Sequence, residues 1–430
     1  KMEYSRLLDE KVIVTLCKEL KLNKDQIYYS EAPLSMSFIS QIRDKLHGKK
    51  DLFYVRRVPQ NSRYVRSSLS MMEQIEAGDI LLSYPFESMQ PFIRLLNEAG
   101  ENEKVVSIKM TLYRVAKNSQ IVEALINAAE SGKEVVVLVE LRARFDEENN
   151  IEWSRRLEDA GCRIIYGIDH IKVHSKLCLI TYCDGTEVKH ITQIGTGNYN
   201  EQTAKLYTDL SLMTANQDIA EEAAQVFNRL CMAQVMEETH HLLVAPKCLQ
   251  NRVLDFIEEE IHHADNNEPA YIGVKMNSLT DKTIIDKMVE ASQHGVKIDL
   301  VVRGICCLIP GIEGYTENIK VISIVGRYLE HSRIYIFGMP ERDKMFISSA
   351  DFMTRNMVKR VEVATPIYDT AIKDRVRTMF GIMLHDTVKG RELCRDGNYY
   401  RREKPQEESE VISSQAYFSN EAYLAASKNV

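Results

Sequence analysis

The sequence predicts an α/β protein in which two similar domains follow the end of a helical domain. From Asp79 onward, strand-like apolar runs alternate with amphipathic helical segments, the pattern of sheets covered by helices. The same order of elements then returns, and Lys275 follows Lys109 by 166 residues (275 minus 109). His331 follows His174 by 157 residues (331 minus 174). A spacing that drifts slowly indicates an internal duplication with loops of unequal length.

Length and composition are those of an ordinary globular protein. The chain has 430 residues, of which 44% are hydrophobic and 27% charged, and this length suits about two or three domains. No apolar run approaches the roughly 20 residues that a membrane-spanning helix needs. The 9 cysteines are scattered and lack the Cys-x-x-Cys spacing of a zinc site. Reduced thiols of this kind are typical of a cytoplasmic protein, which is the location we expect.

The chain is acidic overall. Its formal net charge of -7 argues against a protein that binds nucleic acid through a basic surface, and we expect no nucleic-acid partner. A polyanion would therefore have to bind in a local basic pocket or tunnel.

Residues 1–75 are expected to be the end of a helical domain and a linker. An amphipathic segment with apolar residues at helical spacing runs from Leu7 to Leu16. The basic stretch from Arg56 to Arg66 follows and has the character of a solvated linker. We place the first duplicated domain at residues 76–240 and the second, with a C-terminal tail, at residues 241–430.

The first domain contains a clear strand, helix and strand. Val105–Tyr113 is the first strand. Asn118 or Ser119 can cap the helix that follows, and Gly132 ends it. Glu134–Leu141 is a continuous apolar strand, which is typical of a parallel sheet covered on both sides.

The second domain repeats these elements. Ala270–Met276 is the strand, Asp281 begins the helix and Gly295 ends it. Val296–Arg303 is the next strand, so the order matches that of the first domain. The polar tail after Asp386 is expected to pack as a strap or to fray.

Each domain places a histidine and a cation on one face of a strand. In the first domain, strand alternation puts His174 and Lys176 on the same side. In the second, it does the same for His331 and Arg333. Brought together, the two strands would form one site with two histidines and two cations, which suits a phosphate.

We expect these residues to lie within two continuous strands, Ile171–Ile180 and Glu330–Phe337. His170 shares a face with His174 and is a rival for the same role. The corresponding position of the second domain is Gly326. The spacing alone therefore leaves two candidate histidines in the first domain.

A glycine-rich turn follows the first histidine strand. Gly195 and Gly197 precede Asn198. Without side chains, the two glycines would let backbone amides approach a phosphate closely. The second domain has Ser348–Asp351 at this place, with Asn356 beyond it.

Arginines lie at the ends of several predicted strands. Arg114 follows the first strand, Arg142 and Arg144 follow the second, and Arg303 ends the matching strand of the second domain. Open α/β sheets bind ligands at the carboxyl ends of their strands, and arginine contacts phosphate oxygens through two N–H groups. Surface ion pairs are the alternative interpretation of these arginines.

Six ordered motifs lie along the chain: Tyr84–Met89, Thr111–Ala116, Val139–Glu147, Lys172–Lys176, Ile194–Glu201 and Leu206–Asp209. Together they resemble bacterial polyphosphate kinases of the histidine-dependent type. The resemblance spans nearly the whole chain. The duplicated His-x-basic strands also resemble, more loosely, the phospholipase D superfamily.

The resemblance implies two phospholipase D-like α/β catalytic domains and an ATP:polyphosphate phosphotransferase. His174 would be the phosphorylated nucleophile in a reversible transfer of the ATP γ-phosphate to the end of an inorganic polyphosphate chain. His331 would act as acid or base and contact ATP. Tyr207 and Arg303 correspond to further ATP-contacting positions.

The resemblance also implies Mg²⁺ as a cofactor, associated with the positions of Arg114 and Arg144. A guanidinium group cannot ligate a cation, so we interpret both residues as holding phosphate oxygens to which Mg²⁺ is also bound. By motif position, Lys176, Arg333 and Asn198 complete a phosphate clamp.

Compared with the family, most of the N-terminal region is expected to be missing from this chain. The expected partners are ATP or ADP and inorganic polyphosphate, with a homo-oligomer in the full-length protein. Peripheral association with a membrane is left open. Two other functions fit the same residues: a phospholipase D-type phosphodiesterase or phosphatidyltransferase, and a non-catalytic polyphosphate-binding fragment.

Overall fold

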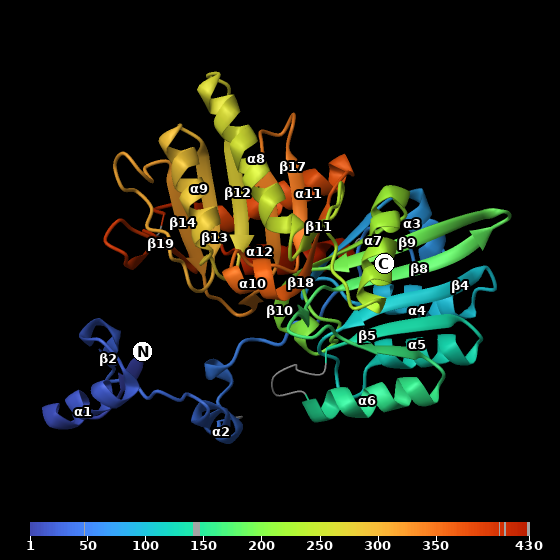
Figure 1. Cartoon of the computed structure of the whole chain (residues 1–430), viewed down its shortest axis with the longest axis horizontal. Helices are drawn as coiled ribbons and strands as arrows, with labels where there is room; N and C mark the ends of the chain where they lie inside the picture. The colour runs from blue at the N-terminus through green and yellow to red at the C-terminus, as the bar shows by residue number, and fades with distance from the viewer. Residues whose placement is uncertain (47, 141–146, 404, 408–409, 428–430) are drawn as a thin grey trace. The chain divides into compact units, whose positions relative to one another are not determined.

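The computed structural model describes residues 1–46, 48–140, 147–403, 405–407 and 410–427 (Figure 1). Its contacts divide the chain into two compact units, Lys1–Arg57 and Val58–Val430. Among the described helices, none combines the length and the apolar character that crossing a bilayer requires.

The first unit contains two helices and a small parallel sheet. β1 (Met2–Tyr4) pairs with β2 (Ile27–Tyr29). Asp9 caps α1 (Glu10–Leu20) by accepting a hydrogen bond from the backbone of its first turn at 2.8 Å. α2 (Phe38–Lys45) completes the unit, together with the 3-10 turns η1 (Lys24–Gln26) and η2 (Lys50–Leu52). The predicted amphipathic segment is helical from Glu10, and neither α1 nor α2 has a buried residue.

The second unit consists of two mixed β-sheets and the helices that cover them. The strands of its first half are β3 (Ile80–Tyr84), β4 (Val105–Leu112), β5 (Glu134–Val139), β6 (Arg163–Tyr166), β7 (Lys172–Val173), β8 (Leu177–Asp184), β9 (Glu187–Gly195) and β10 (Tyr207–Thr214). The helices of this half are α3 (Met71–Ala77), α4 (Gln90–Glu101), α5 (Gln120–Glu130), α6 (Glu147–Asp159), η3 (Thr203–Lys205) and α7 (Gln217–Cys231).

The second half repeats most of this series, without a helix between β13 and β14, and adds a C-terminal extension. Its strands are β11 (Leu243–Ala245), β12 (Tyr271–Met276), β13 (Lys297–Val302), β14 (Ile319–Ile324), β15 (Leu329–Glu330), β16 (Arg333–Phe337), β17 (Lys344–Ser348) and β18 (Arg360–Pro366). Its helices are α8 (Cys248–Asp265), α9 (Lys282–Gln293), α10 (Thr354–Lys359) and α11 (Thr370–Leu384). The extension contains β19 (Gly390–Leu393), β20 (Tyr399–Arg401) and α12 (Ser414–Ser427).

The two sheets have the same strand order. They run β10-β9-β8-β4-β5-β6 in the first half and β18-β17-β16-β12-β13-β14 in the second. In each sheet the last three strands are parallel, and the other neighbours in these series are antiparallel. This shared topology confirms the predicted duplication of an α/β domain.

Each half also contributes one short strand to the other half's sheet. β7 pairs in parallel with β18, with Val173 opposite Val361. β15 pairs in parallel with β10, with Glu330 opposite Thr208. This reciprocal exchange places the segment before each predicted histidine against the other half.

Capping side chains and glycines explain where the equivalent helices α5 and α9 begin and end. Ser119 accepts hydrogen bonds from the first turn of α5 at 3.2 and 3.4 Å, and Asp281 accepts one from the first turn of α9 at 3.2 Å. Gly132 and Gly295 follow the two helices with φ of +85° and +87°, a region that glycine adopts without strain. The predicted caps and stops are therefore confirmed.

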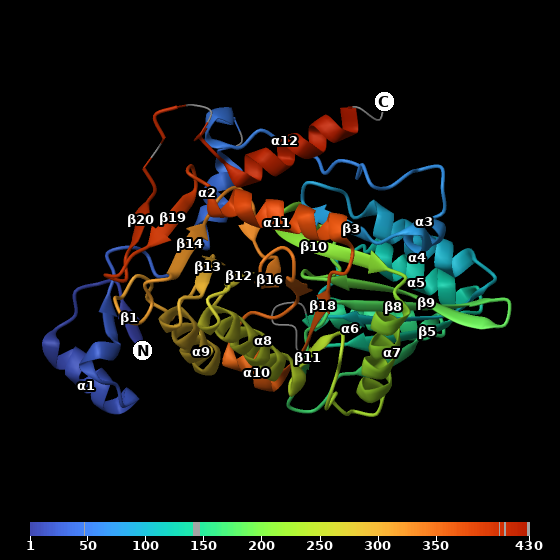
Figure 2. The ribbon, with the colours of Figure 1, turned by 90° about the horizontal axis from the view of Figure 1, so that it is seen from above.

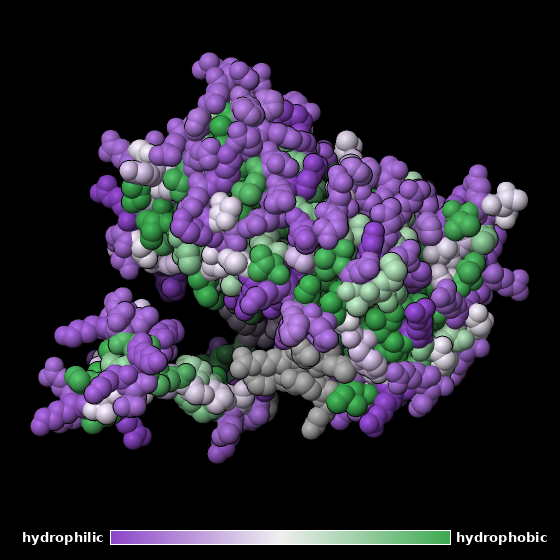
Figure 3. All heavy atoms as spheres, in the orientation of Figure 1, coloured by the Kyte–Doolittle hydropathy of each residue, from purple (hydrophilic) through white to green (hydrophobic). Residues whose placement is uncertain are grey.

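Apolar side chains from both halves share a core. One cluster joins Leu210 of β10 and Val301 of β13 to Phe380 of α11 and Phe418 of α12. Figure 2 shows α12 beside α11 on one side of the sheets, with α8 and α9 on the opposite side. α8 and α9 pack apolar residues on the second sheet and present a mainly hydrophilic surface to solvent (Figure 3).

Candidate active site

The two predicted histidines lie where the chain passes between the halves. One continuous strand was expected from Ile171 to Ile180, but β7 ends at Val173 and β8 begins at Leu177. The strand is interrupted because β7 bonds to β18, whereas β8 bonds to β4 and β9. The second copy is interrupted in the same way, between β15 and β16. The prediction of two continuous strands is wrong, and both histidines lie in the interruptions.

His174 is held by a carboxylate of the second half. Its backbone amide donates to the Val361 carbonyl at 2.9 Å, and its Nδ1 lies 2.9 Å from Oε2 of Glu362. The Ser349 hydroxyl donates to the same oxygen at 2.5 Å, and the Glu362 side chain is 0% exposed. Tyr113 packs edge-on against the imidazole, with ring centroids 5.0 Å apart. A carboxylate at Nδ1 keeps the ring proton there, which leaves the Nε2 lone pair for reaction.

His331 is held by a carboxylate of the first half. Its backbone amide donates to Oγ1 of Thr208 at 3.1 Å. Its Nδ1 lies 2.8 and 3.0 Å from the two carboxylate oxygens of Asp209. The Thr196 hydroxyl donates to one of these oxygens at 2.7 Å. The environment of His331 therefore repeats that of His174 with the roles of the two halves reversed.

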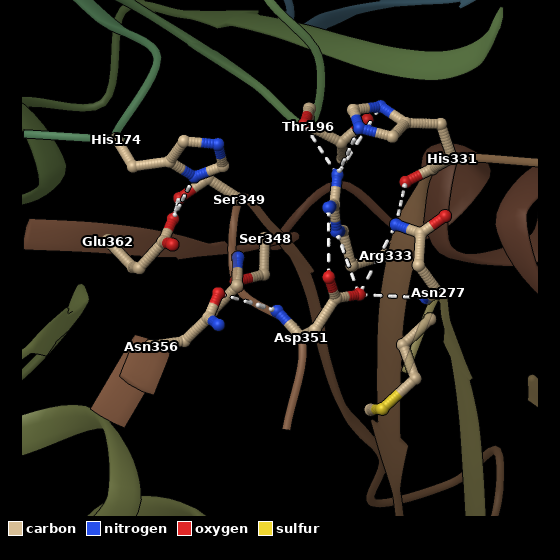
Figure 4. A network of polar contacts seen from close by, with 12 residues as sticks. His174, Thr196, Asn277, His331, Arg333, Ser348, Ser349, Asp351, Asn356 and Glu362 are labelled. Atoms are coloured by element: carbon tan, nitrogen blue, oxygen red, sulfur yellow. Dashed lines mark hydrogen bonds and ion pairs between the residues drawn. The ribbon is translucent and has the colours of Figure 1, made fainter. Parts of the chain in front are cut away.

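The two imidazoles face the same space. Figure 4 shows His174 and His331 pointing toward one another from opposite sides of the site. Glu362 lies in β18 and Asp209 in β10, so each histidine depends on a strand of the other half. The structure thus brings the two His-x-basic motifs into one site.

The glycine-rich turn differs from the expectation at Gly195, whose amide was expected to be open to a phosphate. Gly195 donates its amide to the Lys176 carbonyl at 3.0 Å, so this amide is engaged in the protein. A Cβ on Gly197 would lie 2.0 Å from Oδ2 of Asp209. The absent side chain at Gly197 therefore makes room for this carboxylate. Next to it, Oδ1 of Asn198 is buried without a hydrogen-bond partner among the described residues, and its place in a phosphate clamp stays a prediction.

Gly197→Ala should displace the Asp209 carboxylate and destabilise the protein by about 1–3 kcal/mol, because the new methyl group overlaps it. Chemical denaturation measures this free energy of unfolding. Gly78→Ala is the matched control, since a Cβ there meets nothing within 4 Å and the backbone is extended. Equal stabilities of the two variants would contradict the assigned role of Gly197.

The two cations of the predicted clamp are both buried but are held differently. Lys176 Nζ donates to the His174 carbonyl, and burial lowers the pKa of Lys176 to about 7. Arg333 donates to both carboxylate oxygens of Asp351 at 3.1 and 3.2 Å, and to the Thr196 carbonyl at 3.1 Å. Arg333 thus joins the halves with its charge compensated, whereas Lys176 forms no ion pair with any carboxylate that the structure describes.

Burial lowers the pKa of both histidines below the ordinary value. The positive charges of Lys176 and Arg360 lower the pKa of His174 further. For His331, the Asp209 carboxylate opposes the effect of burial without reversing it. Both imidazoles are therefore neutral at pH 7, the form in which a ring nitrogen acts as nucleophile or proton acceptor.

Two predicted nucleotide contacts border His331. Arg303 Nε donates to Oδ1 of Asn277 at 3.1 Å and to the Glu330 carbonyl at 2.8 Å. The Tyr207 ring centroid lies 5.3 Å from that of His331. Both residues therefore lie beside the same histidine.

The remaining candidates lie on the first half. The Arg114 guanidinium is 5.6 Å from the centroid of Tyr113, the ring that contacts His174. Arg142 and Arg144 lie outside the described residues. His170 is exposed and has a φ of +65°. The buried carboxylate at His174 favours His174 over His170 as the reacting histidine.

The described side chains at this site do not form a metal-binding group. No cluster of at least three His, Cys, Asp or Glu side chains suited to a metal ion occurs within the described part of the chain. Glu362 and Asp209 already bind the two histidines, and the arginines offer no acceptor atoms. The described residues of the site therefore do not fit a Mg²⁺ ion held by their side chains alone.

In the sequence, only the duplication of the domain indicates that Glu362 and Asp209 belong to the site. Asp209 closes one of the six motifs, but the sequence pattern around each carboxylate indicates no role for it. Glu362 follows Asp209 by 153 residues (362 minus 209), and Ser349 follows Thr196 by the same distance (349 minus 196). These equal spacings are the signal that would have found both carboxylates with their hydroxyl partners.

Duplicated α/β domains that share one site with two histidines give the chain a phospholipase D-like fold. The model of polyphosphate kinase C-terminal domain 1 matches residues 70–236, and that of C-terminal domain 2 matches residues 242–415. The chain belongs to the polyphosphate kinase family.

Individual relatives agree with this assignment. The chain is 45% identical over 394 residues to a polyphosphate kinase of Bacillus anthracis, covering 91% of this chain and 56% of that protein. It is 41% identical over 428 residues to one of Lactiplantibacillus plantarum, covering 99% of this chain and 59% of the relative. The chain thus spans little more than half the length of these relatives.

Solved structures show the same relationship. The crystal structure of polyphosphate kinase from Porphyromonas gingivalis superimposes with a TM-score of 0.84 and 33% identity, covering 99% of this chain and 65% of that one. Phosphatidylserine synthase from Haemophilus influenzae has a TM-score of 0.52 at 10% identity, covering 81% of this chain and 94% of that one. The second likeness shows a shared fold alone.

Proposed function

We propose that this chain carries the catalytic domains of a polyphosphate kinase, which reversibly transfers the γ-phosphate of ATP to the end of a polyphosphate chain through phosphorylated His174. The observation that carries this proposal is the His174 imidazole, oriented by buried Glu362 beside buried Lys176. Membership of the polyphosphate kinase family supports ATP and polyphosphate as the substrates.

In the first step, Nε2 of neutral His174 attacks the γ-phosphorus of ATP. A nitrogen–phosphorus bond forms, the bond from the γ-phosphorus to the bridging oxygen breaks, and ADP leaves with that electron pair. The imidazole keeps its proton on Nδ1 and becomes positively charged. Glu362 stabilises this charge through the 2.9 Å contact at Nδ1.

In the second step, a terminal oxygen of polyphosphate attacks the phosphorus. The nitrogen–phosphorus bond breaks, its electron pair returns to Nε2, and the chain is longer by one phosphate. No net proton is released from His174, so the same steps run in reverse with ADP.

His331 is proposed to contact the nucleotide and to act as acid or base on the opposite side of the site. Its Nδ1 is bound to Asp209, and its Nε2, which lies 3.2 Å from Arg333 Nη1, is the atom assigned to a phosphate oxygen or a proton. Tyr207 and Arg303 border this histidine and are assigned to ATP binding.

Mg²⁺ is proposed to enter with ATP as part of the substrate, since the described residues do not fit a resident metal ion. Arg114 and Arg144 are assigned to the phosphate oxygens that share this ion. Lys176 and Asn198 are the stronger members of the phosphate clamp, because Arg333 is engaged by Asp351.

The full-length protein is proposed to be a cytoplasmic homo-oligomer. The state of the cysteines supports this location, since all 9 are free thiols.

The proposal is tested by incubating the protein with γ-labelled ATP and Mg²⁺ and mapping the acid-labile label. Label on His174 that polyphosphate then removes is the expected result. Hydrolysis of a phosphodiester without retained label would replace the proposal by a phospholipase D-type activity. Polyphosphate binding without any phosphohistidine would replace it by a binding module.

The titration of Lys176 should set the alkaline limit of the reaction, the pH above which the reaction becomes slower. Its pKa of about 7 means that its charge is present below this pH and is lost as the pH rises through it. We expect kcat/KM for ATP to fall above about pH 7. The acidic limit, set by His174, should lie below pH 6.5 because its pKa is lowered.

Lys176→Arg separates this explanation from others. Arginine stays charged throughout this range, so the variant should lose the alkaline limit even if its maximal rate is lower. An unchanged alkaline limit in Lys176→Arg would assign the titration to another group.

A further inference from the structure

Gln415 lies at the start of the C-terminal helix α12, where it is 6% exposed. The preceding residue fixes this end of the helix. Ser414 donates its amide and its hydroxyl to one oxygen of Asp386 at 2.8 and 2.6 Å. The other oxygen of Asp386 accepts three backbone amides, those of Val388, Lys389 and Gly390. The first turn of α12 therefore has a defined position independent of the Gln415 side chain.

The Gln415 side chain forms hydrogen bonds with the segment that precedes His331. Its Oε1 accepts the Tyr328 amide at 2.9 Å, and its Nε2 donates to the Tyr328 carbonyl at 2.9 Å. Nε2 also donates to Oε1 of Glu330 at 2.6 Å. A Cβ on Gly326 would lie 2.6 Å from the Gln415 Oε1, so the glycine there leaves room for this contact.

Glu330 links Gln415 to His331 through a series of hydrogen bonds. Its second carboxylate oxygen accepts the Thr208 hydroxyl at 2.9 Å and lies 3.1 Å from Lys275 Nζ. Thr208 Oγ1 in turn accepts the His331 amide at 3.1 Å. Thr208 is followed in β10 by Asp209, the residue that holds the His331 imidazole.

We infer that Gln415 is a positioning residue for His331. By holding both peptide groups of Tyr328 and the Glu330 carboxylate, it sets the register of β15 on β10 and so aims the imidazole at Asp209. The helix α12, which follows the two-domain body, is by this inference a part of the nucleotide side of the site. The expected effect on the reaction rate rests on the proposed function, whereas the effect on His331 itself does not.

Other contacts hold α12 when Gln415 is changed. The Phe418 ring packs against Phe86 with centroids 5.5 Å apart. The Tyr423 hydroxyl accepts the Val58 amide at 2.9 Å, and Arg63 lies 3.4 Å from Glu421. A variant at Gln415 should therefore keep the helix in place.

The charges around Glu330 determine which substitution is most informative. Lys275 on β12 and Arg303 after β13 face Glu330, while Asp209 and His331 lie just beyond it. Gln415→Glu keeps the side-chain shape but places a second carboxylate against Glu330. Two adjacent carboxylates repel each other, but they share a proton more readily at lower pH. The displacement of β15 caused by this repulsion should therefore become smaller as the pH falls.

The test compares Gln415→Glu with the wild-type protein in ¹⁵N-histidine spectra, which report the ring protonation of His331 and His174 separately. We expect the His331 signals and their titration to shift while those of His174 stay unchanged. We also expect kcat/KM for phosphohistidine formation to fall by about 10²-fold, as for a misplacement of roughly 1 Å, because His331 is proposed to contact the nucleotide. The loss should be smaller at pH 6 than at pH 8, a dependence that a purely structural role would not produce.

Asn420→Asp is the matched control, because it makes the same amide-to-acid change at an exposed position of α12. It should leave both histidine spectra and the rate unchanged. If Gln415→Glu does not fold, Gln415→Met removes the hydrogen bonds without adding charge and should shift His331 in the same way to a smaller degree. Unchanged His331 signals in a folded Gln415 variant would overturn the inference. Absence of phosphohistidine in the wild-type protein would instead overturn the proposed function, and the His331 spectra would still decide the role of Gln415.

Discussion

Glu362→Gln is expected to slow the phosphorylation of His174 by about 10⁴-fold while the protein stays folded. The Glu362 carboxylate accepts from Nδ1 of His174 and from the Ser349 hydroxyl at one oxygen. An amide in its place offers donor hydrogens to Nδ1, which moves the ring proton to Nε2, the atom that must attack. A single-turnover measurement of labelled phosphohistidine gives this rate directly.

Ser349→Ala is the matched control for this prediction. It removes the hydroxyl that donates to Glu362 at 2.5 Å but keeps the carboxylate itself. It also removes the acceptor of the Val363 amide, which lies 3.1 Å from the hydroxyl oxygen. Loss of the one hydrogen bond to Glu362 should cost only about 5-fold in rate. Similar losses in the two variants would mean that packing around Glu362, rather than the tautomer of His174, controls the reaction.

His174→Ala is expected to have the largest effect, with a loss of about 10⁶-fold in transfer, because the covalent intermediate can no longer form. The measurement is ATP-dependent elongation of polyphosphate, together with the acid-labile label. His170→Ala is the control, since His170 is exposed, and it should keep the wild-type rate.

The two histidine variants also test the alternative that the sequence left open. Label retained on His170 in the His174→Ala protein would reverse the assignment of the nucleophile. Equal activity of His174→Ala and the wild-type protein would remove the phosphohistidine from the mechanism altogether.

The features that the sequence predicted correctly are determined by neighbouring residues. Ser119 and Asp281 cap helices within a single turn, and the spacing of repeated elements reports the duplication directly. The interruption of the histidine strands was not predicted, because it depends on hydrogen bonds to strands far away in the sequence. β7 pairs with residues near Val361, and nothing in the alternation around His174 indicates this partner.

Only part of the candidate site could be predicted, because the rest depends on residues that are distant in the sequence. His174 and His331 could be identified with their adjacent cations by strand spacing, but their carboxylate partners come from the opposite halves. Arg333 was expected to bind phosphate, and its bidentate contact with Asp351 depends on the packing of β16 beside the following turn. Such pairings require the folded arrangement of both domains.

The reciprocal exchange of β7 and β15 gives the two halves the contacts of a two-fold interface. In a symmetric dimer, residue i of one subunit contacts residue j of the other, and the reverse contact occurs as well. The contacts His174–Glu362 and His331–Asp209 repeat this arrangement within one polypeptide. The chain therefore contains, within one polypeptide, an interface of the kind that a symmetric dimer forms between its subunits. Because both halves belong to one chain, the cations Lys176 and Arg333 differ between the two equivalent positions, as do Asn198 and Asp351. A dimer of identical subunits does not allow such differences.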